Sequence, residues 1–407
     1  MIFISQKVEN IRKVLLKETW IESLLTDGNV YLVGGCIRDS YRNKTIKDID
    51  IVVEELPISS IKKILSHYGE FKEVGDSFAV IKFRPFNHIG EDFDIAIPRI
   101  DRKIGEGHKG FSIETKGVTI LDDLKRRDFT INSIAVNVKT GEILDPFNGT
   151  SDIEKKIIKA TDSTAFIEDP LRILRGIQFA ARFNYLIEKD TLKLMKDNAH
   201  LIMSISGERI LDEFMKVVHK NGNNKIVFDL LQETNVDLAL FNNKISTYDG
   251  IYYLDEVSFF YTLGILGGIS PSDFIKNRLK GERLLEKDLQ TMEKIFKLFP
   301  TINNQEDLRL FLSKSFTVSP RIMQSKIFPS EIENIIKLML KNKIPTTLKD
   351  LNIDGNDILI LSNNEIKDKA LGEVLEKIMR GALMNDFNWK DRLDSLNYLG
   401  NVISKIN

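Results

Sequence analysis

Hydrophobic residues recur with two different periods along this 407-residue chain. Over residues 8–25 they return every three to four positions, which predicts a helix, and residues 58–68 predict another. Short apolar runs at residues 29–33, 48–53, 71–74, 77–84 and 93–98 predict strands, and residues 134–138 and 142–144 predict a hairpin. Residues 1–150 therefore predict an α/β domain built around one sheet.

From about residue 151 the strand signals mostly stop, and helical patterns follow one another with Gly and Pro between them. The predicted fold class is an α/β head with a small mixed sheet, followed by an all-helical remainder. We divide this remainder into a neck over residues 151–220 and a body and tail over residues 221–407.

Composition narrows the function classes. The 58 Lys and Arg and the 59 Asp and Glu leave a formal net charge of −1, so any RNA contact must come from a locally basic face. One cysteine, Cys36, excludes an intramolecular disulfide and argues against a zinc site. No apolar run is long enough to cross a bilayer, and the N-terminus does not resemble a signal peptide, so we expect no membrane partner and a cytoplasmic location.

The first chemical signal is a pair of glycines followed by a pair of aspartates. Gly34 and Gly35 come directly after an apolar run and let backbone N–H groups approach a phosphate closely. Asp48 and Asp50 lie two residues apart in a predicted strand, so their carboxylates share one face. Such a pair is usually a solvated strand edge. Behind a Gly-Gly turn it favours a Mg²⁺ site completed by substrate phosphates.

Five ordered motifs resemble those of class II tRNA nucleotidyltransferases and bacterial poly(A) polymerases. They are YLVGGCIRD at residues 31–39, RRDFTIN at 126–132, DPFNG at 145–149, EDPLR at 168–172 with Arg175, and Glu208-Arg209 with Glu213. The resemblance implies a polymerase-β-like head in which Asp48 and Asp50 are catalytic and hold Mg²⁺. It implies nucleotide binding by Gly34, Gly35, Arg38, Arg127, Asp169, Arg172 and Arg175, and supporting roles for Asp39, Asp128, Asn132, Asp145 and Glu168.

The fourth motif predicts how bases are chosen. On a helix, Asp169 and Arg172 would share a face, as would Arg175 one turn further on. A carboxylate accepts a hydrogen bond from the amine of C or A and a guanidinium donates to the ring acceptors, which discriminates against G and U. We expect Glu168 to orient Arg172. Taken alone, the Asp169–Arg172 pair is typical of a surface salt bridge. The family often has arginine where this chain has Gln178, which predicts a weakened or neutral contact there.

Within the family, the sequence favours addition of CCA to the 3′ acceptor end of tRNA from CTP and ATP. Residues 74–81, VGDSFAVI, and the segment beginning at residue 351 resemble CCA-adding enzymes, and the polar stretch over residues 98–111 resembles a loop linked to A addition. Poly(A) polymerase, a CC-only or A-only enzyme, and a non-catalytic RNA-binding protein on the same fold remain alternatives. Nothing in the sequence predicts an oligomeric state. We expect phosphate contacts from the body, with the candidates Lys314, Arg321, Lys326, Lys341 and Lys343.

Overall fold

A computed structural model describes residues 5–46, 48–74, 80–86, 88, 90–103, 111–302, 304–341, 345, 350–362, 366, 368–384 and 386–405. The chain divides into two compact units, Met1–Ile245 and Ser246–Asn407. The domain boundaries predicted near residues 150 and 220 both lie inside the first unit and stay predictions. Across the described part of the chain, no helix combines the length and the apolar character needed to cross a membrane.

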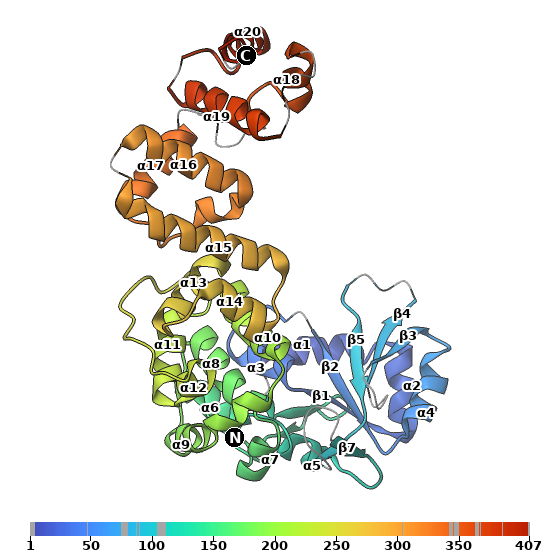
Figure 1. Cartoon of the computed structure of the whole chain (residues 1–407). Helices are drawn as coiled ribbons and strands as arrows, with labels where there is room; N and C mark the ends of the chain where they lie inside the picture. The colour runs from blue at the N-terminus through green and yellow to red at the C-terminus, as the bar shows by residue number, and fades with distance from the viewer. Residues whose placement is uncertain are drawn as a thin grey trace. The chain divides into compact units, whose positions relative to one another are not determined.

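The first unit is built on a seven-stranded mixed sheet, in the order β3-β4-β5-β2-β1-β8-β9 (Figure 1). Strands β2 and β5 pair in parallel, and the other neighbours are antiparallel. The strands are β1 (Asn29–Val33), β2 (Asp50–Glu54), β3 (Gly69–Val74), β4 (Val80–Pro85), β5 (Phe93–Ala96), β8 (Ala135–Asn137) and β9 (Ile143–Leu144). Smaller pairs are formed by β6 (Ile100–Lys103) with β7 (Phe111–Glu114), and by β10 (Ile157–Ile158) with β11 (Leu186–Ile187).

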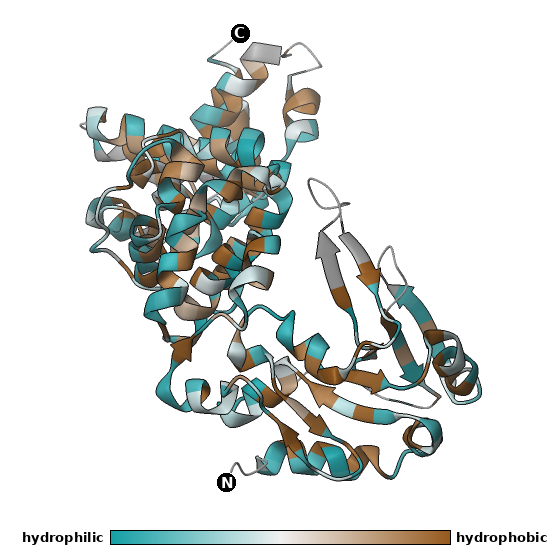
Figure 2. Ribbon diagram, turned by 90° about the horizontal axis from the view of Figure 1, so that it is seen from below, coloured by the Kyte–Doolittle hydropathy of each residue, from teal (hydrophilic) through white to brown (hydrophobic). Residues whose placement is uncertain are grey.

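Both faces of this sheet are covered, which is why its central strands are apolar runs. On one face Trp20 packs against Phe83 and Phe93, with ring centroids 5.1 Å apart in each pair. On the other face Tyr31, Val33, Val52 and Ala135 pack against α5 (Ile120–Lys125) through Ile120 and Leu124. Strand residues alternate between these two layers. Figure 2 shows the strands largely brown and the outer faces of many helices teal.

The remaining helices of the first unit are α1 (Gln6–Leu15), α2 (Thr19–Asp27), α3 (Gly35–Tyr41), α4 (Ile58–Leu65), η1 (Thr130–Asn132), α6 (Gly149–Lys155), α7 (Ser163–Glu168), α8 (Leu171–Phe183), α9 (Lys189–Asp197), η2 (Ala199–Ser204), α10 (Gly207–His219), α11 (Asn224–Glu233) and α12 (Val236–Phe241). Helix α8 packs against α10 and α11 and carries Arg172 and Arg175 of the fourth motif.

Three sequence predictions in this unit are wrong in detail. The neck over residues 151–220, expected to be all-helical, contains the short parallel pair of β10 and β11. The single helix expected over residues 8–25 is two helices, because α1 packs against α3 while α2 packs against β1 and α4. The strand expected to begin at Asp48 begins at Asp50. Its partner β1 ends at Val33, opposite Asp50, so there is no strand for Asp48 to pair with. Residues 75–79 and 104–110, on which the motif at 74–81 and the loop at 98–111 depend, lie outside the described residues.

The second unit is helical wherever its secondary structure is described, as predicted. Its elements are α13 (Glu256–Leu266), α14 (Pro271–Asp273), the π-helical segment η3 (Phe274–Leu279), α15 (Arg283–Leu298), η4 (Phe299–Thr301), α16 (Gln305–Val318), η5 (Pro320–Gln324), α17 (Ser330–Lys341), α18 (Gly355–Leu361), α19 (Asp368–Met384) and α20 (Arg392–Ile403). Helices α14 and α13 pack against α15, and α16 packs against α19.

Candidate active site

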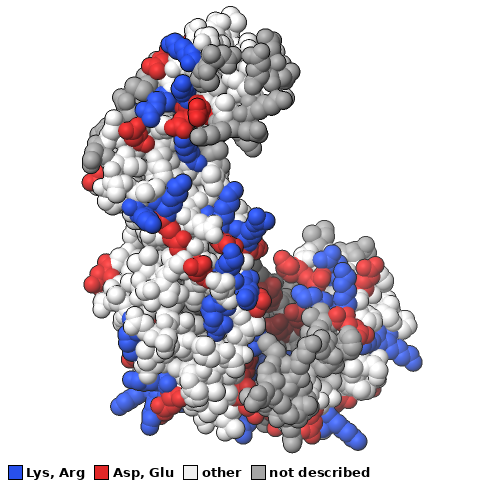
Figure 3. Space-filling view, in the orientation of Figure 1, with Lys and Arg blue, Asp and Glu red and all other residues white. Residues whose placement is uncertain are grey.

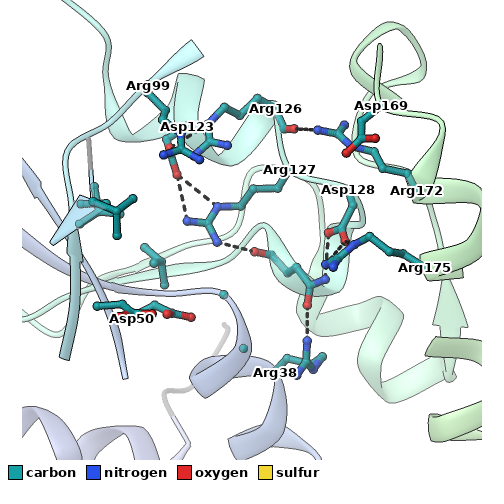
Figure 4. Close-up of a pocket in the computed structure, with 18 of the residues that line it drawn as sticks. Arg38, Asp50, Arg99, Asp123, Arg126, Arg127, Asp128, Asp169, Arg172 and Arg175 are labelled. Carbon is teal, nitrogen blue, oxygen red and sulfur yellow. Dashed lines mark hydrogen bonds and ion pairs between the residues drawn. The ribbon is translucent and has the colours of Figure 1, made fainter. Parts of the chain in front are cut away.

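A cavity of about 600 Å³ opens on the α5 face of the sheet, where β1 ends and β2 begins. Figure 4 shows Asp50 on one side of it and Asp169, Arg172 and Arg175 on the other. Its walls contain the predicted residues Gly34, Gly35, Arg38, Asp50, Arg127, Asp128, Asn132, Asp169, Arg172 and Arg175. The fold therefore brings ten of the predicted site residues together around one space.

Two carboxylates lie side by side on the sheet wall. Asp50 is directly opposite Asp94 in the parallel pairing of β2 with β5, so both side chains project toward the cavity. Burial raises the pKa of Asp50, and although Arg127 lowers it, the charges of Asp94 and Asp48 raise it further. Oδ1 of Asp94 accepts no hydrogen bond, and it forms an ion pair with Nζ of Lys82 on β4, 3.6 Å away. Asp48 is exposed and lines an adjoining cavity that shares Asp50.

These carboxylates fit a hard divalent cation. They repel one another, and a cation bound between them would relieve that repulsion. Lys82 approaches Oδ1 of Asp94 only at 3.6 Å, too far for a hydrogen bond. Over the described residues, no three His, Cys, Asp or Glu side chains form a complete metal cage. Mg²⁺ does not need one, since it is normally held by one or two carboxylates together with substrate phosphates and water.

Gly34 makes the turn that opens the cavity. Its φ of 69° and ψ of −122° suit glycine almost alone. A Cβ placed there would lie 2.7 Å from Nη1 of Arg127 and 3.8 Å from Oδ2 of Asp50. The missing side chain therefore leaves the space in which Arg127 approaches the carboxylates.

Arg127 is held in this position by Asp123, a buried residue that the sequence analysis did not select. Asp123 Oδ2 accepts hydrogen bonds from Nε and Nη2 of Arg127 at 3.2 and 3.0 Å, and Oδ1 accepts from Arg126 at 2.6 and 3.0 Å. Burial would raise the pKa of Asp123, but the two guanidinium groups lower it overall. The three- and four-residue spacing of these arginines from Asp123 was the available sequence signal.

A chain of polar contacts links the turn to α8. Arg38 donates to Asp39 at 2.9 and 3.0 Å and to the Asn132 side chain at 2.5 Å. Asn132 in turn donates to Oδ1 of Asp128 at 2.9 Å, and Arg175 donates to Oδ2 of Asp128 at 2.8 Å. Burial would raise the pKa of Asp128, but Arg175 and these hydrogen bonds lower it to about 2. Asp128 therefore stays ionised and fixes Arg175 at the cavity wall.

Asp145 lies outside this cavity. Its carboxylate accepts hydrogen bonds from the backbone N–H groups of Gly149 and Thr150 at 2.6 and 2.9 Å and from the Thr150 hydroxyl at 2.6 Å. These bonds tie the loop after β9 to the start of α6.

Asp169 and Arg172 both reach the cavity, although they are not on one helix. Asp169 is extended, with φ −116° and ψ 97°, between α7 and α8. Pro170 explains this, because proline disfavours helical geometry in the residue before it. The expectation of a shared helical face is therefore wrong.

Asp169 and Arg172 are oriented by groups other than the expected ones. Arg172 donates to the carbonyls of Ala165 and Arg126 at 2.7 and 2.6 Å, and in the described structure Glu168 makes no hydrogen bond or ion pair with it. Two backbone carbonyls thus hold Arg172, and the role expected for Glu168 stays a prediction without a supporting contact. Arg209, from the start of α10, approaches Asp169 at 3.3 and 3.5 Å and also lines the cavity. It belongs to the fifth motif, which was noted without a site role.

The adjoining cavity, of about 510 Å³, contains the position where this chain departs from the family. Gln178 lines it and is 2% exposed, and its Nε2 has no hydrogen-bond partner. Arg182, one turn later on α8, lines the same space, and burial lowers its pKa to about 10. A neutral donor therefore occupies position 178 beside a cation at position 182.

Comparison with known proteins gives the family. Residues 30–159 match the model of the Poly A polymerase head domain, and residues 184–241 match that of a probable RNA and SrmB-binding site of polymerase A. A multifunctional CCA protein of Shewanella frigidimarina is 39% identical over 218 residues, 52% of this chain, and the match spans only half of that relative. The CCA-adding enzyme of Francisella tularensis subsp. novicida is 32% identical over 373 residues, 80% of this chain and 97% of the relative.

The chain belongs to the CCA-adding enzyme family. The family prediction made from the motifs is confirmed. Solved structures confirm the fold class: the Bacillus stearothermophilus CCA-adding enzyme in complex with CTP superposes with a TM-score of 0.68 at 19% identity, covering 97% of this chain and 98% of that one. The Thermotoga maritima CCA-adding enzyme in complex with tRNA gives 0.67 at 22% identity, covering 99% and 97%.

Proposed function

We propose that this chain adds CCA to the 3′ end of tRNA without a nucleic-acid template, using CTP and ATP and releasing pyrophosphate. The observation that supports the proposal most directly is that one cavity has two walls of different chemistry. The sheet wall presents the carboxylates of Asp50 and Asp94, and the helical wall presents Asp169, Arg172 and Arg209. The first set suits a metal-bound polyphosphate and the second suits the edge of a base.

The helical wall selects the base. The carboxylate of Asp169 accepts a hydrogen bond from the exocyclic amine that C and A share, and Arg172 donates to the ring acceptors beside it. Because two carbonyls fix Arg172, its remaining N–H groups are aimed before the nucleotide arrives. G and U offer no amine at that place, so they would leave Asp169 with no amine donor, which is a strong ground for rejection.

The sheet wall holds the reacting phosphate. Asp50 and Asp94, with Asp48 at the neighbouring cavity, would hold Mg²⁺, which when bound polarises the α-phosphate and stabilises charge on the departing pyrophosphate. Gly34 lets the phosphates approach the backbone, and Arg127, locked by Asp123, supplies a fixed positive charge beside them. Arg38 and Arg175 line both cavities, so the nucleotide's phosphates can lie between them.

The names of the relatives support the substrates. The Francisella relative, a CCA-adding enzyme, aligns over 97% of its length. CCA-adding enzymes have been solved with CTP, with ATP and with tRNA. We place the activity in the cytoplasm, where tRNA lacking its 3′ end, CTP and ATP would meet the enzyme.

The test is incorporation of labelled CTP and ATP into three RNAs: tRNA ending before CCA, tRNA ending after CC, and an RNA hairpin unrelated to tRNA. We expect C and then A on the first, A on the second and nothing on the third. Asp50→Ala should abolish incorporation, whereas Asp92→Ala, which removes a carboxylate outside the cavity that pairs with Arg84 at 2.6 Å, should not. Long A tracts on all three RNAs would instead identify a poly(A) polymerase.

A further inference from the structure

Helix α15 in the second unit carries an exposed basic stripe. Its exposed residues Arg283, Lys287, Gln290, Lys294 and Lys297 are separated by four, three, four and three positions, so they follow one line along the helix. We call this set the α15 stripe. At 1.5 Å per residue it extends over about 21 Å. Among the described contacts, none of its four cations forms an ion pair, and Figure 3 shows blue side chains gathered where α15 lies.

The acidic residues of α15 do not neutralise the α15 stripe, because other groups engage them. Glu286 pairs with Lys276 at 3.0 Å, and Asp288 is buried and accepts from Nε of Arg321 at 2.7 Å. Glu293 accepts hydrogen bonds from the side chains of Ser270 and Ser272 at 2.8 and 2.7 Å. The acidic side chains of α15 are thus engaged by other groups of the fold, whereas its four stripe cations lie on the surface.

The residues first expected to bind phosphate are less available. Lys314 forms an ion pair with Glu376, Arg321 is taken by Asp288, and Lys326 donates to the carbonyl of Tyr253 at 3.2 Å. The side chains of the other two candidates, Lys341 and Lys343, lie outside the described residues. An ion pair already formed must be broken before its cation can serve a phosphate, so these positions are poorer binders than the α15 stripe.

We propose that the α15 stripe binds the sugar–phosphate backbone of RNA and, resting on the function proposed above, of the tRNA substrate. Lysine is a flexible point charge that suits phosphate without reading base sequence. A membrane-binding helix would expose an apolar face beside its charges, but Leu289, Met292 and Ile295 of α15 are buried. A row of cations without ion-pair partners, on a chain whose net charge is −1, is typical of a surface that binds a polyanion. The length of the α15 stripe matches a ligand whose negative charges repeat at regular intervals.

The experiment measures the affinity of the full chain for tRNA lacking CCA as a function of salt. The test variant is Lys287→Gln/Lys294→Gln. Its matched control is Lys193→Gln/Lys196→Gln, which removes two exposed lysines of α9 in the first unit. Since each phosphate contact contributes a little under one unit to the log–log salt slope, the test variant should lose roughly 1.5 units of slope and bind roughly tenfold more weakly at low salt. The control should keep the wild-type slope.

A charge-conserving variant separates this prediction from misfolding. Lys287→Arg/Lys294→Arg keeps both cations of the test variant and should keep the wild-type slope. Equal slopes for the test variant, its control and wild type would overturn the proposal, as would a wild type that does not bind tRNA. Binding is read without catalysis, so a chain that binds through the α15 stripe and yet adds no nucleotide would refute the proposed function alone.

Discussion

Adding one methyl group at Gly34 should damage the site in two separable ways. Gly34→Ala places a side chain on a residue with φ 69° and ψ −122°, a conformation that costs a non-glycine residue about 1–3 kcal/mol. The new Cβ would also lie 2.7 Å from Nη1 of Arg127, closer than any ordinary contact. Arg127 cannot swing aside freely, because Asp123 holds two of its nitrogens at 3.0 and 3.2 Å.

The stability and activity effects should therefore differ in origin. Backbone strain predicts a loss of about 1–3 kcal/mol in the free energy of unfolding. Displacement of Arg127 by about 1 Å predicts a fall of roughly 100-fold in kcat/KM, which is about 2.7 kcal/mol of transition-state stabilisation. Gly35→Ala is the control for stability, because a Cβ there would lie 3.6 Å from Nη2 of Arg38, an ordinary contact, in the first turn of α3.

The assay is a double-mutant cycle between Gly34→Ala and Arg127→Ala, with kcat/KM for CTP and urea unfolding measured on all four proteins. If the methyl group acts through Arg127, Gly34→Ala should cost little further activity once Arg127 is alanine, although the stability loss from backbone strain should persist. Additive losses of activity would show that Gly34 does not act through Arg127. An unchanged Gly34→Ala enzyme would refute both parts of the reasoning.

Two further predictions concern the aspartates that support the cavity. Asp94→Asn removes the carboxylate charge that lies opposite Asp50 on the sheet wall. The Mg²⁺ concentration that gives half-maximal activity should therefore rise at least tenfold, with tRNA binding unchanged. An unchanged Mg²⁺ requirement would exclude Asp94 from the metal site. For Asp128, a folded-state pKa of about 2 against an ordinary aspartate pKa of 3.8 corresponds to about 2 kcal/mol of stability, which is present above pH 4 and lost as pH falls toward 2. Asp128→Asn should therefore be less stable than wild type by that amount at pH 7, and the difference in unfolding free energy should shrink in acid. Unfolding can be followed by Trp20 fluorescence in a Trp389→Phe background. A stability difference that does not depend on pH would contradict the Asp128–Arg175 pairing.

Local sequence pattern predicted the elements but not every boundary. The strand over residues 29–33 was predicted with the bounds that β1 has, since a short apolar run buried on both faces is distinctive. The start of β2 depends on where its partner β1 ends. Strand β1 ends at the Gly34 turn, sixteen residues before Asp50, so the sequence around Asp50 does not reveal this boundary. The break between α1 and α2 follows from packing against different neighbours, which a continuous apolar period cannot reveal.

The motifs predicted which residues gather, and long-range contacts decided how they are held. The extended backbone at Asp169 does have a local signal, because Pro170 disfavours helical geometry in the residue before it. The contact of Arg209 with Asp169 spans forty positions, and the pairing of Asp94 with Asp50 depends on the register of two parallel strands. Neither relation has a local signature. The α15 stripe likewise can be recognised only once the buried face of α15 and the partners of its acidic residues are known.

The central claim is that the protein itself chooses C and A through Asp169 and Arg172. The most direct test measures kcat/KM for CTP, ATP, UTP and GTP on one tRNA acceptor with wild type, Asp169→Ala and Arg172→Ala. Loss of a base-edge contact should cost about 1–3 kcal/mol of discrimination, so selection against UTP and GTP should relax by roughly one to two powers of ten while the overall rate falls. If both variants slow all four nucleotides equally and keep the preference for C and A, base choice does not reside in this pair and the account is wrong.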